Sequence, residues 1–156
     1  MVLLAEYVGA QRDALIARLR RVLALRAMVA TGMSQRQIAQ ELGISQPAVS
    51  QQLAFPELDT VHPELLMDAA APILTTLATE RGYSRLAAFG SVARRQARPD
   101  YDIDLLVATP EGTSTLEFIR FKELIEQVLG RPVDMIDYGG LKPGLDDDIR
   151  REAVLL

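Results

Sequence analysis

Apolar residues recur at helical spacing through much of the chain. Residues 11–30 combine Leu, Ala and Arg with no helix-breaking residue before Gly32, so this pattern predicts a helix. The same spacing predicts further helices over residues 64–81, 113–130 and 145–156. Pro72 lies inside the first of these and predicts a kink or a break, because proline cannot donate the helical hydrogen bond.

Short apolar runs between turn residues predict strands that alternate with these helices. They cover residues 84–89, 102–108 and 132–137. The resulting order of alternating helices and strands predicts an α/β or α+β unit around a small sheet.

Two short helices are predicted to meet at Gly43. Ser34 and Ser45 each stand where a side-chain oxygen can cap the start of a helix, and Pro47 falls in a first turn, where its missing N–H is harmless. Gly43 is expected to leave the first helix in a left-handed conformation. Val49 is expected to face inward.

Residues 35–53 resemble the helix-turn-helix of bacterial repressors, with small Ala39 where the helices cross. The expected small core is Ile38, Leu42, Ile44 and Val49. The helix after Ser45 would then enter the major groove, where a glutamine amide can pair with adenine. The residues expected at DNA are Gln35, Arg36, Ser45, Gln46, Ser50 and Gln51, with Arg36 on phosphate. The alternative is a helical hairpin whose glutamines only face water.

Charge separates the two ends of the chain. Residues 1–55 hold six arginines and three acids, a net +3, whereas the remainder has a net charge of −7. This asymmetry favours an anionic partner for the first part and a metal ion or basic partner for the second. The chain has no cysteine, no apolar run of membrane-spanning length and no signal-peptide pattern, so we expect a cytoplasmic protein without membrane contact. His62, the one histidine, is assigned no role.

Two aspartates on one predicted strand carry the candidate chemistry. Asp102 and Asp104 project to the same face, and Ile103 projects to the opposite one. Adjacent carboxylates repel each other unless a hard cation such as Mg²⁺ lies between them. Before them, Gly90 allows a close approach of backbone to ligand, and Ser91 can cap a short helix whose N–H groups suit a phosphate.

The segments G-S-x-A-R, D-x-D-L-L-V and G-R-P-V-D, together with the tail I-R-R-E-A-V-L-L, resemble the minimal nucleotidyltransferase family. This resemblance implies that Gly90 and Ser91 hold a nucleoside triphosphate. It also implies that Asp102, Asp104 and Asp134 are the catalytic carboxylates that bind two Mg²⁺ ions. Such ions clamp the attacking and leaving oxygens in phosphoryl transfer.

Other charged residues near these motifs leave alternatives open. Asp134 and Asp137 point to opposite faces of their strand, so only one can serve, and the resemblance favours Asp134. Arg94 could contact phosphate or pair with a nearby acid. The chain also departs from the family pattern, with Arg95 in place of glycine and Tyr101 in place of serine. Arg95 would crowd the loop if its position needs a positive φ, and Tyr101 would narrow the approach to the site.

The predicted organisation is an all-α helix-turn-helix domain over residues 1–55, a linker over 56–63 and a nucleotidyltransferase domain with a small mixed sheet over 64–156. The resemblance implies an antitoxin that transfers AMP from ATP to a helical partner toxin of the HEPN type. The helix-turn-helix suggests a dimer that binds double-stranded operator DNA and represses its own operon. Alternatives are a transcriptional regulator with an inactive transferase domain and, less favoured, an antibiotic-modifying transferase.

Overall fold

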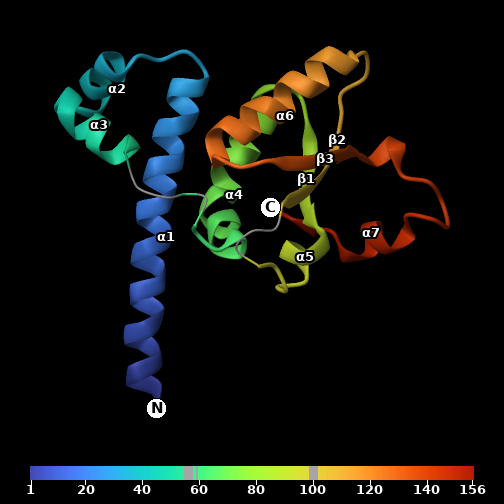
Figure 1. Ribbon diagram of the computed structural model, residues 1–156, viewed down its shortest axis with the longest axis horizontal. Helices are drawn as coiled ribbons and strands as arrows, with labels where there is room; N and C mark the ends of the chain where they lie inside the picture. Colours follow the sequence, from blue (N-terminus) through green and yellow to red (C-terminus); the bar gives the residue numbers. More distant parts are fainter. Residues whose placement is uncertain (55–57, 59, 99–101) are drawn as a thin grey trace.

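The computed structural model describes residues 1–54, 58, 60–98 and 102–156. Its elements are α1 (Val2–Ala30), α2 (Gln35–Leu42), α3 (Gln46–Leu53), α4 (Pro63–Glu80), β1 (Ser84–Phe89), α5 (Gly90–Ala93), β2 (Ile103–Ala108), α6 (Thr115–Leu129), β3 (Val133–Asp137), the 3-10 turn η1 (Tyr138–Gly140), α7 (Asp147–Glu152) and β4 (Val154–Leu155). Figure 1 shows α2 and α3 on one side of the long helix α1, and the α/β part on the other.

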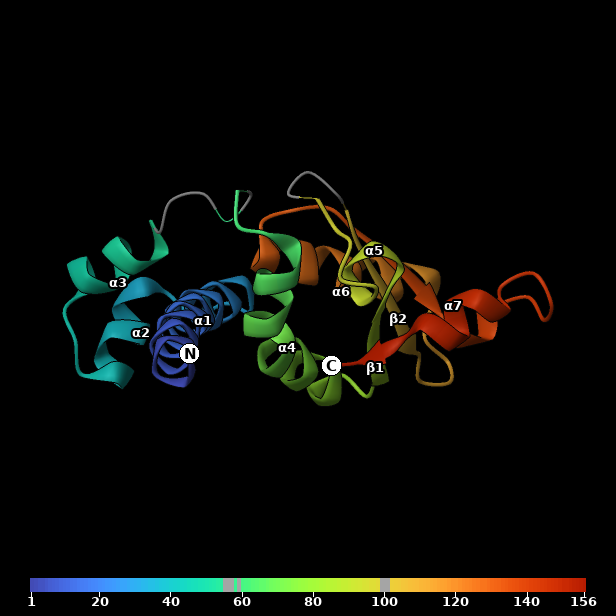
Figure 2. The same ribbon diagram turned by 90° about the horizontal axis from the view of Figure 1, so that it is seen from below.

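Helix α1 begins at Val2 rather than at residue 11, so it is longer than predicted. The side chains of its first turns are exposed: Leu4 is 61% exposed and Tyr7 66%. Its second half lies between α2–α3 and α4, as Figure 2 shows. Leu19 and Leu23 are fully buried in the core of the α/β part, whereas Leu25 belongs to a separate small core with α2 and α3. The predicted division at residues 55 and 64 stays a prediction, and α1 contributes to both cores.

The two short helices have the predicted caps. The Ser34 hydroxyl accepts a hydrogen bond from the Gln37 N–H, and the Gln37 side chain accepts one from the Ser34 N–H. The Ser45 hydroxyl accepts from the Ala48 N–H. Gly43 is left-handed, with φ of 68°, and therefore reverses the chain between α2 and α3.

The small core differs from the prediction. Ile38, Ala39 and Val49 are buried as expected, but Leu42 and Ile44 are 49% and 38% exposed. Those two residues flank the turn at the outer end of the pair. The residues that complete this core are Leu25 and Met28 of α1, together with Met33 and Leu53.

The sheet has four strands in the order β3-β2-β1-β4, which confirms a small mixed sheet within an α+β fold. β2 pairs in parallel with β3 and antiparallel with β1. The fourth strand was not predicted, because the tail 145–156 was assigned to one helix. Helix α7 ends at Glu152, and Val154 then pairs with Ala88 of β1. A β-branched residue after a one-and-a-half-turn helix suits this extended pairing.

The two faces of the sheet have different covers. Ile103, Leu105 and Val133 face the main core beneath α4 and α6. The opposite face holds a smaller apolar cluster that includes Phe89 and Leu106, covered by η1 and α7. Because side chains alternate along a strand, Asp104 and Asp134 share this second face.

Helix α4 is continuous across Pro72, so the break suggested by the sequence is absent. Its buried face extends through the proline from Leu66 to Leu74, and this packing outweighs one missing hydrogen bond. His62, for which the sequence indicated no role, caps α4: its Nδ1 accepts the Glu64 N–H at 3.3 Å.

Two arginines connect distant segments through backbone carbonyls. Arg26 of α1 donates from Nε and Nη2 to the carbonyls of Val128 and Gln127, at 2.8 and 2.7 Å, where α6 ends. Arg131, which is buried, donates from Nη2 to the carbonyl of Val61 at 2.8 Å, and so fixes the chain before α4. No helix in the described ranges combines the length and apolarity needed to cross a membrane.

Substitution of Leu23 by Ala tests whether α1 is structural for the α/β part. Deletion of a fully buried leucine side chain is expected to lower the free energy of unfolding by about 3 kcal/mol. Leu4→Ala, on the exposed first turns, is the matched control and should change it by less than about 0.5 kcal/mol. Urea denaturation measures both, and equal small effects would show that α1 is dispensable.

Candidate active site

Three aspartates lie near the positions where β2 and β3 begin. Asp102 directly precedes β2, Asp104 is its second residue, and Asp134 is the second residue of β3. The parallel register pairs Asp104 with Asp134, and the antiparallel register pairs Asp104 with Phe89 at the end of β1. Ile103 is fully buried toward the opposite face, as predicted. Strand pairing therefore brings together the carboxylates that lie far apart in the sequence.

The environment of Asp104 makes its negative charge unfavourable. Burial, the neighbouring Asp134 and the nearby Asp102 raise its pKa to about 6, whereas Arg94 acts in the opposite direction. Asp104 is half-buried and lies beside Asp134 in the parallel register, while Asp102 and Asp134 are exposed. Among the described residues, no three carboxylate, histidine or cysteine side chains are already gathered around one metal position. The close unit is thus the Asp104–Asp134 pair, with Asp102 at its edge.

Gly90 is required by its position against Asp104. It has φ of 71°, and a Cβ there would collide with Oδ2 of Asp104 and lie 3.3 Å from its Cγ. Any other residue would therefore be strained and would displace the carboxylate. The predicted approach of a ligand to Gly90 stays a prediction, and the neighbour that the structure places there is Asp104.

Ser91 lies in the one-turn helix α5 but does not cap it. Phe89 occupies the N-cap position and no side chain caps this helix, so the predicted capping role of Ser91 is wrong. The chain enters α5 two residues earlier than expected, with the N-cap at Phe89 instead of Ser91, which places Ser91 inside the helix. Its carbonyl accepts the Gln96 N–H at 2.9 Å, which closes the loop after α5.

The two arginines after α5 point to different acids. Arg94 donates from Nη1 to Oε2 of Glu152 in α7 at 2.8 Å, which is the pairing that the sequence left open beside phosphate contact. Arg95 adopts a left-handed conformation with φ of 57°. This conformation costs a residue with a Cβ about 1 kcal/mol. Arg95 also donates from both terminal nitrogens to Asp68 of α4, at 3.1 and 3.3 Å.

The sequence pattern did not indicate Asp68 as part of this region. It is one acid among many on a helix, and no spacing links it to the loop after β1. Tyr101, the second departure from the family pattern, lies outside the described residues. Asp137 is separate from the aspartate group: its carboxylate accepts the N–H groups of Thr109 and Gly139, both at 3.0 Å. It therefore holds the chain where β2 and β3 end.

The residues predicted to contact DNA lie on α2 and α3 and are largely exposed. Gln46 donates from Nε2 to Oε1 of Gln35 at 2.7 Å, which joins the first turns of the two helices. Arg36, Ser50 and Gln51 are exposed on the same helices. The hydroxyl of Ser45 is occupied by capping.

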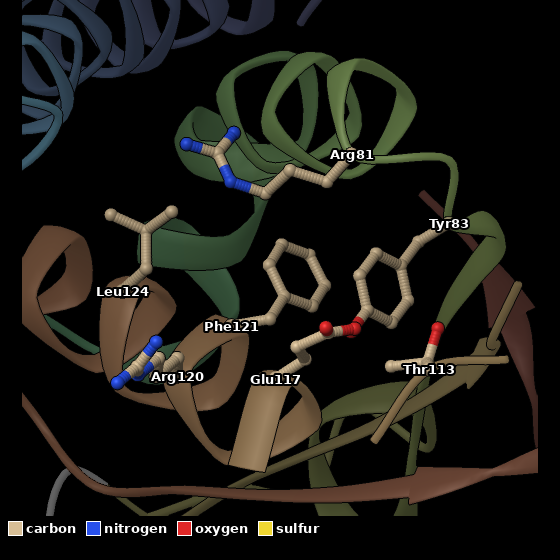
Figure 3. A pocket seen from close by; sticks show the side chains of 7 residues that line it. All are labelled: Arg81, Tyr83, Thr113, Glu117, Arg120, Phe121 and Leu124. Atoms are coloured by element: carbon tan, nitrogen blue, oxygen red, sulfur yellow. The ribbon is translucent and has the colours of Figure 1, made fainter. Parts of the chain in front are cut away.

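A cavity of about 310 Å³ lies at the other end of β1, beside Tyr83, as Figure 3 shows. It contains none of the predicted site residues. Tyr83 and Phe121, which are among its lining residues, are buried and stack with ring centroids 4.1 Å apart. Burial and, secondarily, the charge of Glu117 raise the pKa of Tyr83. The aromatic pair therefore serves packing between α4 and α6.

Comparisons with known proteins indicate the family to which the chain belongs. A family model described as a nucleotidyltransferase domain matches residues 73–156, more than half of the chain. A proposed protein adenylyltransferase of Methanocaldococcus jannaschii is 43% identical over 75 residues, covering 48% of this chain and 81% of that protein. Protein adenylyltransferase MntA of Thermococcus cleftensis is 38% identical over 73 residues, covering 47% and 74%.

A solved structure of a proposed minimal nucleotidyltransferase is also similar. It superposes with a TM-score of 0.55 and 40% identity, and covers 60% of this chain and 95% of that one. The region matched by the family model, residues 73–156, includes β1, α5, β2 and β3, which carry the predicted aspartates and the glycine-serine turn. The expectation of a transferase is thereby confirmed: the chain belongs to the nucleotidyltransferase domain family and is a nucleotidyl-transferring enzyme.

Proposed function

We propose that this protein transfers AMP from ATP to a partner protein, with Asp102, Asp104 and Asp134 as the catalytic carboxylates. The observation that carries the proposal is the pairing of Asp104 with Asp134 directly against Gly90. Two relatives are named for protein adenylyl transfer, which supports the choice of nucleotide and of a protein acceptor.

The donor atoms at this site fit magnesium. Mg²⁺ prefers oxygen ligands and is commonly held by one or two carboxylates, substrate phosphates and water rather than by a complete protein cage. Asp104 and Asp134 supply such a pair, and Asp102 stands close enough to raise the pKa of Asp104. Two ions bound here would polarise the phosphoryl oxygens and activate the acceptor hydroxyl.

The remaining residues of the site have roles that follow from their positions. Gly90 has no side chain to obstruct the space beside Asp104, and Ser91 follows it on α5 with a hydroxyl that can donate to a phosphate oxygen. Arg94 is electrostatically coupled to Asp104, and its guanidinium is anchored by Glu152. It can therefore offset negative charge near a triphosphate without direct contact.

The proposal extends to an antitoxin whose acceptor is a helical toxin of the HEPN type and whose α2–α3 unit represses the shared operon as a dimer. Support for DNA binding comes from exposed polar residues on α3 and from the net +3 charge of residues 1–55. Gln46 donates one of its two side-chain N–H groups to Gln35. Its second N–H can therefore donate to N7 of an adenine, and its side-chain carbonyl can accept from the N6 amino group. The pairing with Gln35 also orients this amide in advance.

Labelled ATP and Mg²⁺, mixed with this protein and the product of the neighbouring gene, should label that product. Asp102→Ala combined with Asp104→Ala should reduce labelling by at least about a hundredfold, because two of three metal-binding carboxylates are removed. A variant with two exposed acids replaced, Glu111→Ala with Glu123→Ala, is the control and should label normally. Labelling that survives in the aspartate variant would refute the enzymatic proposal.

Asp104→Asn should stabilise the metal-free protein at pH 7.5. A carboxyl whose pKa is raised holds its proton more tightly when folded, so its ionisation destabilises the fold increasingly from about pH 4 to pH 6 and fully above that. After allowance for solvent screening, we expect a gain of about 1 kcal/mol at pH 7.5 and none at pH 4. Urea denaturation in EDTA measures this gain.

Glu123→Gln, at an exposed site, is the matched control for that experiment and should change the free energy of unfolding by the same small amount at both pH values. Addition of Mg²⁺ at pH 7.5 should raise the free energy of unfolding of the unchanged protein by more than it raises that of the Asp104→Asn variant. A gain from Asp104→Asn that is equal at the two pH values would show that the ionisation of Asp104 is not its cause.

Gel shifts with the promoter of the protein's own operon test the DNA-binding half. Gln46→Ala combined with Gln51→Ala should weaken specific binding by at least about tenfold, since each lost base contact costs about 1–3 kcal/mol. Binding to unrelated DNA should change little. Gln11→Ala with Gln127→Ala, away from α2 and α3, serves as the control; an equal loss in both variants would contradict readout by α3.

A further inference from the structure

We propose that Asp68 is a positioning residue for the loop that follows β1, and that Arg12 of α1 supports it. Asp68 lies on α4, outside the aspartate group, and acts through Arg95. The inference rests on the proposed function, in which Gly90 and Ser91 of this loop hold the nucleotide.

One carboxylate receives two arginines from different parts of the chain. Arg95 donates from Nη2 to Oδ1 of Asp68 at 3.1 Å and from Nη1 to Oδ2 at 3.3 Å. Arg12 donates from Nη2 to the same Oδ2 at 2.6 Å. The Asp68 side chain is 28% exposed, less than either arginine, so it is the fixed centre of the group.

Arg95 needs this support because of its backbone conformation. Its φ of 57° is one that residues with a Cβ rarely adopt. In that conformation the Arg95 N–H donates to the Val92 carbonyl at 3.1 Å, and the next N–H, of Gln96, donates to the Ser91 carbonyl at 2.9 Å. If Arg95 relaxed to a negative φ, the chain would leave α5 in another direction and the Gln96–Ser91 hydrogen bond would break.

Packing alone does not hold the loop on the α4 side. A cavity of about 210 Å³ lies between α4 and α5, and Asp68, Val92, Ala93 and Arg95 are among its lining residues. Val92 is the buried anchor of α5. On the other side, Arg94 is held by Glu152 of α7. Ion pairs therefore restrain the loop on both sides, and the one at Asp68 restrains Arg95, the residue with the strained backbone.

Arg12 extends this arrangement to α1. The helix that packs against α2 and α3 thereby shares a carboxylate with the loop after β1. Since Asp68 has two oxygens and both accept from Arg95, the contact with Arg12 restrains the orientation of the carboxylate rather than replacing either bond. The contribution of Arg12 should be the smaller one.

The test combines Asp68→Asn with a background that removes the strain. In the protein with Arg95, Asp68→Asn should speed hydrogen exchange at the amides of Arg95 and Gln96 by about fivefold, the scale of a partly exposed ion pair. It should raise KM for ATP in the labelling reaction by a similar factor, about fivefold, with kcat little changed. Arg12→Gln should have about a twofold effect on both. Glu80→Gln removes the same charge from the far end of α4 and should change neither the exchange rate nor KM.

In the Arg95→Gly background, glycine adopts the left-handed conformation without help, so Asp68→Asn should no longer change exchange or KM. Loss of the Asp68→Asn effect in this background supports the inference. An unchanged exchange rate in Asp68→Asn, or an effect that persists after Arg95→Gly, would overturn it. Exchange requires no nucleotide, so it decides the inference even if ATP transfer fails, which would refute the proposed function alone.

Discussion

Strand register at Asp104 is the constraint on which the rest of the site depends. Antiparallel pairing with β1 sets Asp104 opposite Phe89, and parallel pairing with β3 sets it beside Asp134. A shift of one residue in either pair would turn the carboxylates toward the apolar core. The sheet is held in this register by fully buried neighbours, among them Ile103 and Leu105. Packing on one face thus forces repelling acids together on the other.

Burial and, after it, this repulsion make the ionised form of Asp104 unfavourable. The raised pKa of Asp104 shows that the fold bears an unfavourable charge there, which a divalent cation would offset. Gly90 lies directly against the same carboxylate. Arg94 is paired with Glu152 and Arg95 with Asp68. The loop and the aspartates therefore form one unit. Helix α1 joins this unit to the two-helix part through its buried leucines and through Arg12.

Much of this could be predicted from the sequence because local chemistry determines it. Caps at Ser34 and Ser45 and the turn at Gly43 depend on neighbouring residues alone, and they were predicted correctly. Alternation along β2 likewise placed Ile103 in the core. Two of the failures depended on distant parts of the chain: Leu25 and Met28 of α1 complete the small core in place of Leu42 and Ile44, and β4 forms by pairing with β1. The cap predicted at Ser91 failed locally, because the helix begins earlier. Asp68 had no local signal at all.

A crystal structure of the protein with Mg²⁺ and a non-hydrolysable ATP analogue would test the central claim most directly. The account predicts a cation bound by Asp104 and Asp134, with the triphosphate beside Gly90 and Ser91. A nucleotide bound elsewhere, for example in the cavity beside Tyr83, or a triphosphate bound without contact between these aspartates and a cation, would contradict it.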